Sequence, residues 1–158
     1  MKRFFLLVIL VFSMITTFAE NPKQIKSFTD LMDYLKKGAD VNVVLYYEKC
    51  QLISDNEIVE KVPQAIGGMK LDVWEYFAPQ SVHNEKAFLV SSTSKLIQYP
   101  KGDGYVYNYV KIKLYDDNTV KITAQYIDSV TYKILMDESF YGIINDGDND
   151  EGVCLFIK

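Results

Sequence analysis

The sequence predicts an α+β protein, mainly antiparallel β, in which one N-terminal helix packs on a curled sheet or a small barrel. Three observations predict this class. One amphipathic stretch has helical spacing, most of the remaining chain alternates apolar and polar residues with a period of two, and short polar turns separate the alternating segments. Consecutive strands joined by short turns favour an antiparallel sheet over βαβ units.

The N-terminus has the pattern of a secretory signal. Two cations precede an apolar run of about a dozen residues, which is shorter than the roughly 20 residues that a membrane-spanning helix needs. Small side chains on either side of Phe18 favour cleavage after Ala19. We therefore expect a signal peptide at residues 1–19 and a single mature domain at residues 20–158. An uncleaved membrane anchor is the alternative.

Composition limits the classes of partner. Cleavage would remove Lys2 and Arg3, so fifteen cations would remain against twenty-one acids, a net charge of −6. Arg3 is the only arginine, so the mature chain lacks the bidentate guanidinium that recognises phosphate in nucleic acids. We expect no nucleic-acid partner, no stable membrane insertion after cleavage and no cofactor.

Two cysteines, Cys50 and Cys154, remain in the mature chain. An even number of cysteines in an exported chain predicts one disulfide. It would close a loop of roughly 100 residues, which contributes about 4–5 kcal/mol in the chain-entropy model and often less in practice. Two free thiols or a nucleophilic cysteine are the alternatives.

The predicted helix covers residues 27–37. Ser27 can cap its start and Asp30 follows three residues later, a variant of the capping box. Gly38 can supply the left-handed stop. One face carries the apolar residues Phe28, Leu31, Met32 and Leu35. This stripe predicts packing against a core rather than a partner site.

Alternation with a period of two predicts the strands. The predicted strands are residues 41–48, 71–77, 86–92, 95–99, 105–115, 119–127, 131–144 and 153–157. Gly67 and Gly68 are expected to form a bend that leads into the second strand. Residues 116–118 are expected to form a tight turn, because short polar side chains tolerate such turns. The strand at residues 131–144 is expected to be bent.

Several segments carry a resemblance to a known family. Among them are Tyr46-Tyr47-Glu48-Lys49-Cys50, Ile66-Gly67-Gly68-Met69-Lys70, Tyr107-Asn108-Tyr109-Val110 and Asp137-Glu138-Ser139-Phe140. In this order and spacing they resemble the VirK family of small exported bacterial proteins, over most of the mature chain. The resemblance implies a periplasmic or secreted protein of a Gram-negative bacterium, in a family first named from a plant pathogen's virulence regulon. It implies no catalytic residue.

The sequence contains no complete catalytic constellation. His83 is the only histidine and lies in a stretch that reads as a turn. Asp72 and Glu75 lie near aromatic residues, as in some sugar sites, but alternation along a strand would place the two carboxylates on opposite faces. We therefore predict no catalytic residue, and whether the protein is an enzyme stays open.

Asp146, Asp148 and Asp150 have the one-three-five spacing of a calcium-binding loop. Positions six and twelve of that pattern require glycine and glutamate, and this chain has Glu151 and Ile157 there. A solvated acidic turn is the favoured interpretation. Weak calcium binding is the alternative, and no other metal site is predicted.

Tyr105, Tyr107 and Tyr109 are expected on the face of their strand that lies opposite its aliphatic residues, and Lys111 and Lys113 continue this face. We call Tyr105, Tyr107, Tyr109 and Lys111 the tyrosine strip. Alternating tyrosines give a flat amphipathic surface of the kind used in recognition. The alternative is that the helix or another sheet layer covers it.

The leading functional hypothesis is an exported, non-enzymatic protein that binds a macromolecular partner, either a protein or a component of the cell envelope or host. The tyrosine strip is its candidate binding surface. A small-molecule carrier that uses the interior of the sheet is the alternative. A glycan-acting enzyme is less favoured.

Overall fold

The computed structural model describes residues 21–54 and 57–157. The predicted signal peptide at residues 1–19 lies outside the described residues. The elements in chain order are β1 (Lys23–Ile25), α1 (Phe28–Lys36), β2 (Val41–Tyr46), a 3₁₀ turn (Tyr47–Lys49), β3 (Gln51–Ser54), β4 (Glu57–Val59), β5 (Ile66–Lys70), β6 (Trp74–Phe77), β7 (Phe88–Gln98), β8 (Tyr105–Tyr115), β9 (Thr119–Asp128), β10 (Ile134–Ile143) and β11 (Val153–Ile157). Across the described part of the chain, no helix is both long and apolar enough to span a bilayer.

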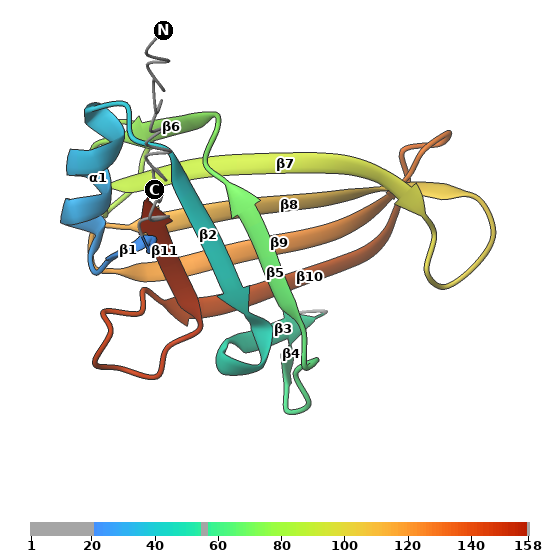
Figure 1. The fold of residues 1–158 in the computed structure, drawn as a ribbon. Coiled ribbons are helices and arrows are strands. Elements are labelled where there is room, and N and C mark those ends of the chain that lie inside the picture. Colours follow the sequence, from blue (N-terminus) through green and yellow to red (C-terminus); the bar gives the residue numbers. More distant parts are fainter. Residues whose placement is uncertain (1–20, 55–56, 158) are drawn as a thin grey trace, which may run out of the picture.

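The strands form two antiparallel sheets (Figure 1). The smaller sheet has the order β1-β11-β2-β5, and the larger has the order β4-β3-β10-β9-β8-β7-β6. The predicted class, mainly antiparallel β with one N-terminal helix, is confirmed. The sheets are open and packed on one another, so the small barrel that the sequence also allowed is not formed.

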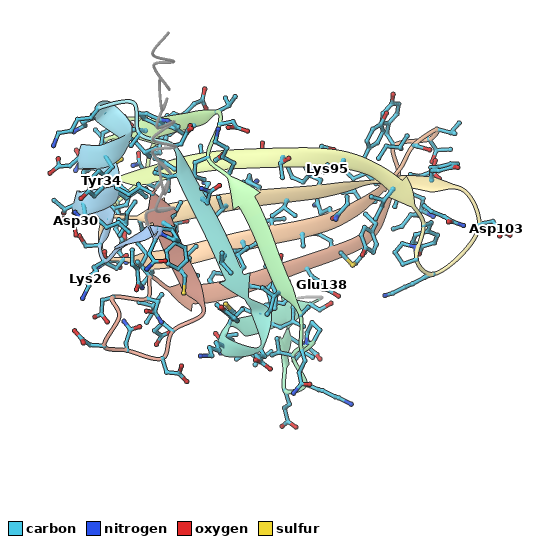
Figure 2. All side chains as sticks on the ribbon, in the orientation of Figure 1. Lys26, Asp30, Tyr34, Lys95, Asp103 and Glu138 are labelled. Carbon is cyan, nitrogen blue, oxygen red and sulfur yellow. The ribbon has the colours of Figure 1, made fainter. Side chains whose placement is uncertain are left out.

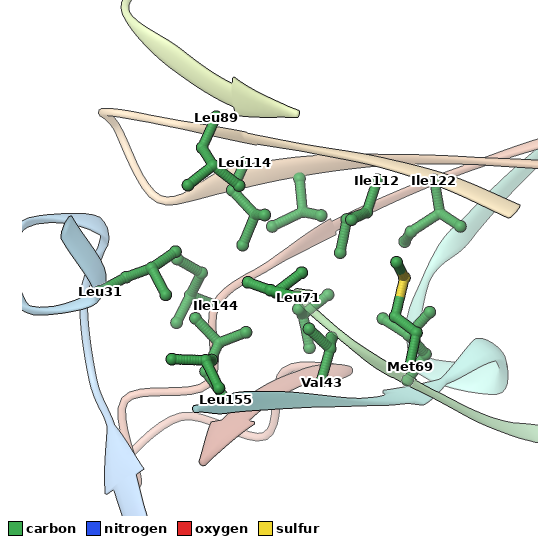
Figure 3. Packing of buried hydrophobic residues seen from close by; sticks show 14 of the residues in the cluster. Leu31, Val43, Met69, Leu71, Leu89, Ile112, Leu114, Ile122, Ile144 and Leu155 are labelled. Atoms are coloured by element: carbon green, nitrogen blue, oxygen red, sulfur yellow. The ribbon is translucent and has the colours of Figure 1, made fainter. Parts of the chain in front are cut away.

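An aliphatic core fills the space between the two sheets (Figure 3). The smaller sheet contributes Val43 and Leu155, and the larger sheet contributes Ile112 and Ile122 from β8 and β9. Each of these four side chains is at most 1% exposed. We call the side of the seven-stranded sheet that meets this core its inner face, and the opposite side its outer face.

Helix α1 closes one end of the core (Figure 1). The Ser27 hydroxyl caps it by accepting a hydrogen bond from the Asp30 backbone N–H at 3.1 Å, and Gly38 ends it with a left-handed φ of 79°. The predicted stripe of Phe28, Leu31, Met32 and Leu35 is buried in the core cluster. The backbone N–H of Phe28 also donates to the Asn118 side chain at 2.8 Å, which fixes the helix start to the β8–β9 turn.

The strands of the larger sheet are longer than those of the smaller one. Strands β7 and β8 have 11 residues each, whereas β2 has 6 and β5 has 5. As a result, β7 to β10 continue past β5 to an end that the smaller sheet does not cover (Figure 1). Lys95 and Asp103 mark this extension in Figure 2.

The structure corrects three strand predictions. The strands predicted at residues 86–92 and 95–99 are replaced by the single strand β7 (Phe88–Gln98), which runs through the gap between them. Gly67 and Gly68, predicted as a bend, lie inside β5, and only Trp74–Phe77 of the predicted strand at residues 71–77 is a strand. The short strands β1, β3 and β4 were not predicted, because three or four residues give too few alternations for a pattern. The strand predicted at residues 131–144 is β10 (Ile134–Ile143), and its pairing with β9 shifts register between Ile134 and Met136.

Candidate functional site

The tyrosine strip lies on the outer face of the seven-stranded sheet. Its residues alternate along β8 with Val106 and Ile112, which are at most 1% exposed. Because successive strand residues point to opposite faces, the strip points away from the core. The smaller sheet and α1 both lie on the other side of the larger sheet (Figure 1), so neither of the layers expected to cover the strip does so.

The exposed fraction of the strip's side chains is highest at Tyr105, the first residue of β8, and lower at the strip's other three residues. The Tyr105 side chain is 60% exposed, whereas Tyr107 and Tyr109 are half-buried by their neighbours in the sheet. The Tyr107 ring stacks on Tyr132 from the β9–β10 turn, with ring centroids 6.5 Å apart and planes 5° apart. Leu96 lies directly across from Tyr107 on β7 and is 56% exposed. This end of the outer face therefore combines partly exposed tyrosine rings with an exposed leucine side chain.

Uncharged polar side chains surround the tyrosines on the neighbouring strands. The β7 partners of Tyr109 and Lys111 are Ser94 and Ser92, and their β9 partners are Gln125 and Thr123. Hydroxyl and amide groups beside rigid aromatic rings provide hydrogen bonds at an otherwise apolar contact. The outer face thus combines both kinds of group that recognition surfaces use.

Lysines occupy the other end of the same face. Lys111, Lys113 and Lys121 line a small hollow of about 150 Å³ together with Tyr115 and Thr123, and we call it the lysine hollow. A larger hollow of about 490 Å³ adjoins it through Tyr115. The outer face is therefore aromatic towards the uncovered end of the sheet and cationic towards the end near the β8–β9 turn.

A groove lies at the edge of the larger sheet, between β3, β10 and the chain that follows β4. Its volume is about 610 Å³, and its lining includes Ser54, Lys61 and Glu138. Nearby, the Tyr47 ring packs on Phe140 with centroids 4.7 Å apart. Burial, followed by the proximity of Cys50 and Glu138, raises the pKa of Tyr47.

Three of the segments that carry the family resemblance meet at this ring. Tyr47 comes from the first of them, Phe140 from the last, and Gly67 lies beneath the ring, where an added Cβ would be 2.9 Å from Tyr47. These residues therefore have a packing role that the structure accounts for. Sequence reasoning could not foresee their meeting, because they lie far apart along the chain.

The structure does not contain the predicted disulfide. Cys50 and Cys154 are both free thiols. The Cys50 sulfur fills the space beside Gly142 and Gly152, where an added Cβ on either glycine would lie 3.0 Å from it. Cys154 follows the fully buried Val153 on β11 and therefore points to the opposite side of the smaller sheet, away from the core. The two sulfurs thus occupy different environments.

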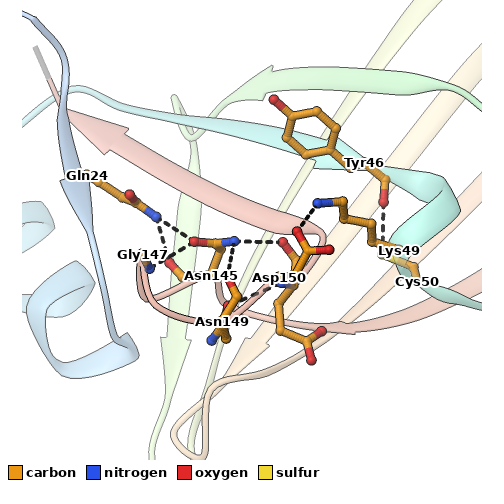
Figure 4. Close-up of polar contacts among 9 residues, drawn as sticks. Gln24, Tyr46, Lys49, Cys50, Asn145, Gly147, Asn149 and Asp150 are labelled. Carbon is orange, nitrogen blue, oxygen red and sulfur yellow. Dashed lines mark hydrogen bonds and ion pairs between the residues drawn. The ribbon is translucent and has the colours of Figure 1, made fainter.

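The acidic loop after β10 is organised by its own hydrogen bonds (Figure 4). The Asn145 carboxamide oxygen accepts from Gln24 Nε2 and from the Gly147 backbone N–H, each at 2.9 Å, and its nitrogen donates to the Glu151 carbonyl at 3.0 Å. The N-terminal strand β1 is thereby tied to a loop near the other end of the chain.

The three aspartates of the calcium hypothesis have separate partners. The Asp146 carboxylate accepts backbone N–H bonds from Asn149 and Asp148, which lower its pKa, and Asp150 pairs with Lys49. Within residues 21–54 and 57–157, no group of three or more His, Cys, Asp or Glu side chains gathers closely enough to hold a metal ion. The one-three-five spacing does not produce a shared coordination site in this loop.

The other candidate residues are not brought together. His83 is exposed and has a left-handed φ of 59° in the loop after β6. Asp72 forms an ion pair with Lys70 at 3.0 Å, and Glu75 lies on the edge strand β6 opposite Val90 of β7. The carboxylate pair of a glycan-cleaving site is thus not assembled from these two residues.

Comparisons with known proteins agree with the resemblance seen in the sequence. The family model described as VirK protein matches residues 24–132. The fold is similar to the crystal structure of lpg1832, a VirK family protein from Legionella pneumophila, with a TM-score of 0.63 and 14% sequence identity over 84% of this chain and 98% of that chain. No curated protein matches the chain. At 14% identity the likeness to lpg1832 shows the fold alone, but the family model spans more than half of the sequence, and the chain therefore belongs to the VirK family.

Proposed function

We propose that this VirK family chain is an exported, non-enzymatic binding protein that recognises a macromolecular partner through the outer face of its seven-stranded sheet. The tyrosine strip forms the centre of the contact. The surrounding serines, Thr123 and Gln125 provide hydrogen bonds at its margins. Recognition surfaces of antibodies use the same combination of rigid tyrosines and small adaptable polar groups.

One observation carries the proposal: the tyrosines point away from the core, on the side of the sheet opposite the helix and the smaller sheet (Figure 1). Exposed aromatic side chains concentrated on one face of a sheet mark interaction sites more often than scattered ones do. Tyr105 and Leu96 are 60% and 56% exposed, and they lie at the same end of this face.

Affinity capture with the mature chain tests the proposal. Capture from the native cell envelope and culture medium by the unaltered chain identifies the partner, and the purified partner is then titrated with the Tyr107→Ala/Tyr109→Ala variant. We expect binding to weaken at least about a hundred-fold, because truncating two central aromatic anchors costs about 2 kcal/mol or more each. Unchanged affinity in a folded variant rejects this surface.

Tyr76→Ala is the matched control. Tyr76 is a 43% exposed tyrosine on the edge strand β6, and its register partner Leu89 is fully buried on the inner face. The control therefore removes an exposed tyrosine that does not point to the outer face. Its partner affinity is expected to equal that of the unaltered chain.

Export is a separate part of the proposal, supported by the signal-like pattern of residues 1–19. N-terminal sequencing of the protein from its native cells tests it. We expect a chain that begins at Glu20, in the periplasm or the culture medium. An intact Met1 end on the bulk of the protein contradicts export by cleavage.

A carrier that holds its ligand between the sheets is less well supported. The core cluster between the sheets consists mainly of buried aliphatic side chains (Figure 3). A ligand there would have to displace these side chains, and dense interiors resist such changes.

A further inference from the structure

The lysine hollow brings three cations of the outer face together. In the register of β8 and β9, Lys113 lies directly across from Lys121, and Lys111 lies directly across from Thr123. Directly opposed residues in an antiparallel pair have Cβ atoms about 4.5–5.5 Å apart. The three lysine side chains are half-buried, so their stems lie on the sheet rather than extending freely into water.

Among the described residues, no acidic one occupies an outer-face position directly adjacent to this cluster; Glu75 on β6 lies one strand further away, across Val90 from Lys113. The positions next to the three lysines on the outer face are Tyr109, Tyr115, Ser92, Val90, Thr119, Thr123 and Tyr141. All of them are uncharged. In the described part of the chain, the ion pairs that form use Lys49, Lys70 and Lys86 instead.

The two opposed lysines lean apart onto aromatic rings. The Lys113 ammonium lies 4.3 Å from the centroid of the Phe88 ring, and the Lys121 ammonium lies 5.3 Å from that of Tyr141. Cation–π contacts of this kind leave the positive charge of each ammonium group unneutralised. Like charges directly opposite each other destabilise a sheet. The chain has more acidic residues than cations, yet none of the acidic residues in the described sheets lies directly opposite Lys113 or Lys121.

We propose that the lysine hollow is a binding site for a tetrahedral dianion, namely inorganic sulfate, inorganic phosphate or the phosphate group of a larger ligand. The ammonium groups of Lys111, Lys113 and Lys121 supply the charge, and the hydroxyls of Thr123 and Tyr115 supply two further donors around the hollow. A volume of about 150 Å³ admits one such group with the remainder of the ligand outside.

The negative net charge of the chain does not prevent this binding. At physiological salt, charges separated by more than about 8 Å are largely screened, so the three local cations dominate the potential inside the hollow. The predicted mature chain contains no arginine for bidentate recognition of phosphate, but lysine binds phosphate as a point charge. The site goes beyond the proposed function, because it requires no macromolecular partner and can be measured on the mature chain alone.

Calorimetric titration of the mature chain with inorganic phosphate, inorganic sulfate and acetate, at matched ionic strength, tests the site. We expect both dianions to bind at least about ten-fold more tightly than acetate. The Lys113→Gln/Lys121→Gln variant should lose at least about ten-fold in dianion affinity. The Tyr107→Ala/Tyr109→Ala variant should keep it, so failure of this site and failure of the proposed recognition surface give different results.

Lys95→Gln/Lys101→Gln is the matched control. It removes the same charge from two exposed lysines of the uncovered end, outside the hollow. Its dianion affinity should equal that of the unaltered chain. Equal losses in the control and the hollow variant, or no preference for dianions over acetate, would overturn the proposal.

The melting temperature gives a second readout. Without a dianion, Lys113→Gln should melt higher than the unaltered chain at low salt, because it removes the repulsion between Lys113 and Lys121. Added phosphate should raise the melting temperature of the unaltered chain and not that of Lys113→Gln/Lys121→Gln. A phosphate-dependent rise that is the same in both chains contradicts the site.

Discussion

At the scale of single residues, two groups of lysines differ in the side chains that they contact. Lys70 contacts both Asp40 and Asp72 at 3.0 Å, and Lys86 contacts Asp117 at 2.5 Å. In contrast, Lys113 and Lys121 oppose each other on the outer face and contact aromatic rings. The first group is neutralised within the chain. The second group has no carboxylate partner within the part of the chain that the structure describes. Its positive charge is therefore available to bind an anionic ligand, whereas the charge of the paired lysines is not.

The two thiols should react at different rates. Burial raises the pKa of Cys50 to about 11, so only about one molecule in a thousand carries a Cys50 thiolate near pH 8. Cys154 is half-exposed. Under native conditions we expect an alkylating reagent to modify Cys154 first and Cys50 only slowly, as measured by mass spectrometry over time.

Cys154→Ser is the control for this assignment, and it should show the slow reaction alone. Unfolding should expose both thiols equally. If neither cysteine reacts until a reductant is added, the protein contains a disulfide and the free thiols of the structure do not describe its state.

The Asp117 carboxylate should contribute to stability in a pH-dependent way. Burial opposes its ionisation, but hydrogen bonds from Lys86 and Thr119 lower the pKa of Asp117 to about 2 in the folded chain, below the roughly 3.9 of an unfolded aspartate. Its stabilising effect is therefore present above about pH 4 and is lost as the pH falls towards 2. We expect Asp117→Asn to melt below the unaltered chain near neutral pH and the difference to vanish towards pH 2.

Asp103→Asn, which removes an exposed aspartate from the β7–β8 turn, is the control and should show no such convergence. A melting difference for Asp117→Asn that is the same at every pH would contradict the role of the charge.

Strand β5 shows what decides structure at the scale of elements. Its two glycines read as a bend in the sequence, because glycine is depleted in strands and common in turns. In the fold, Gly67 lies beneath the Tyr47 ring, and its lack of a side chain is what lets the ring approach the backbone. Tertiary packing thus overrides the local preference of the residues.

Gly67→Ala should destabilise the protein, and Gly68→Ala should not. A Cβ at position 67 would lie 2.9 Å from the Tyr47 ring, which Phe140 holds from another side, whereas a Cβ at position 68 would meet only the Val43 carbonyl at 3.6 Å. Overpacking of this kind costs about 1–3 kcal/mol. Urea denaturation of both variants measures it, and equal stability of the two contradicts the packing role of Gly67.

The elements that the sequence predicted correctly are those with local signals. The helix has a cap, an apolar stripe and a terminal glycine within a dozen residues. The hairpin of β8 and β9 has long alternation on both sides of one turn. If the two strands pair symmetrically about Asp117 at the centre of that turn, Lys113 lies directly across from Lys121, as it does in the structure. The sequence placed Lys111 and Lys113 on one face of their strand, and this register adds Lys121 beside them.

Two features could not be predicted, because they depend on contacts between distant segments. The meeting of Tyr47, Gly67 and Phe140 requires the arrangement of both sheets. To predict that the tyrosine strip is uncovered, one must know which face of the larger sheet the smaller sheet covers. The count of cysteines was also misleading, since it contains no information on the directions in which the two side chains point.

At the scale of the whole molecule, the two sheets divide the chain into a covered and an uncovered surface. The smaller sheet and α1 close the aliphatic core on the inner face, and the longer strands of the larger sheet carry the outer face past them (Figure 1). The same face bears the tyrosine strip and the lysine hollow, which share β8 and Lys111. One continuous surface therefore offers aromatic contacts at one end and positive charge at the other.

Photo-crosslinking in the native cells tests the claim that this surface meets the partner most directly. A photoreactive residue replaces either Ser94, which pairs with Tyr109 on the outer face, or Asn42, which alternates with the buried Val41 and Val43 on the smaller sheet. We predict a crosslinked macromolecule from position 94 and none from position 42. Crosslinks from position 42 alone, or equally from both positions, would contradict the account.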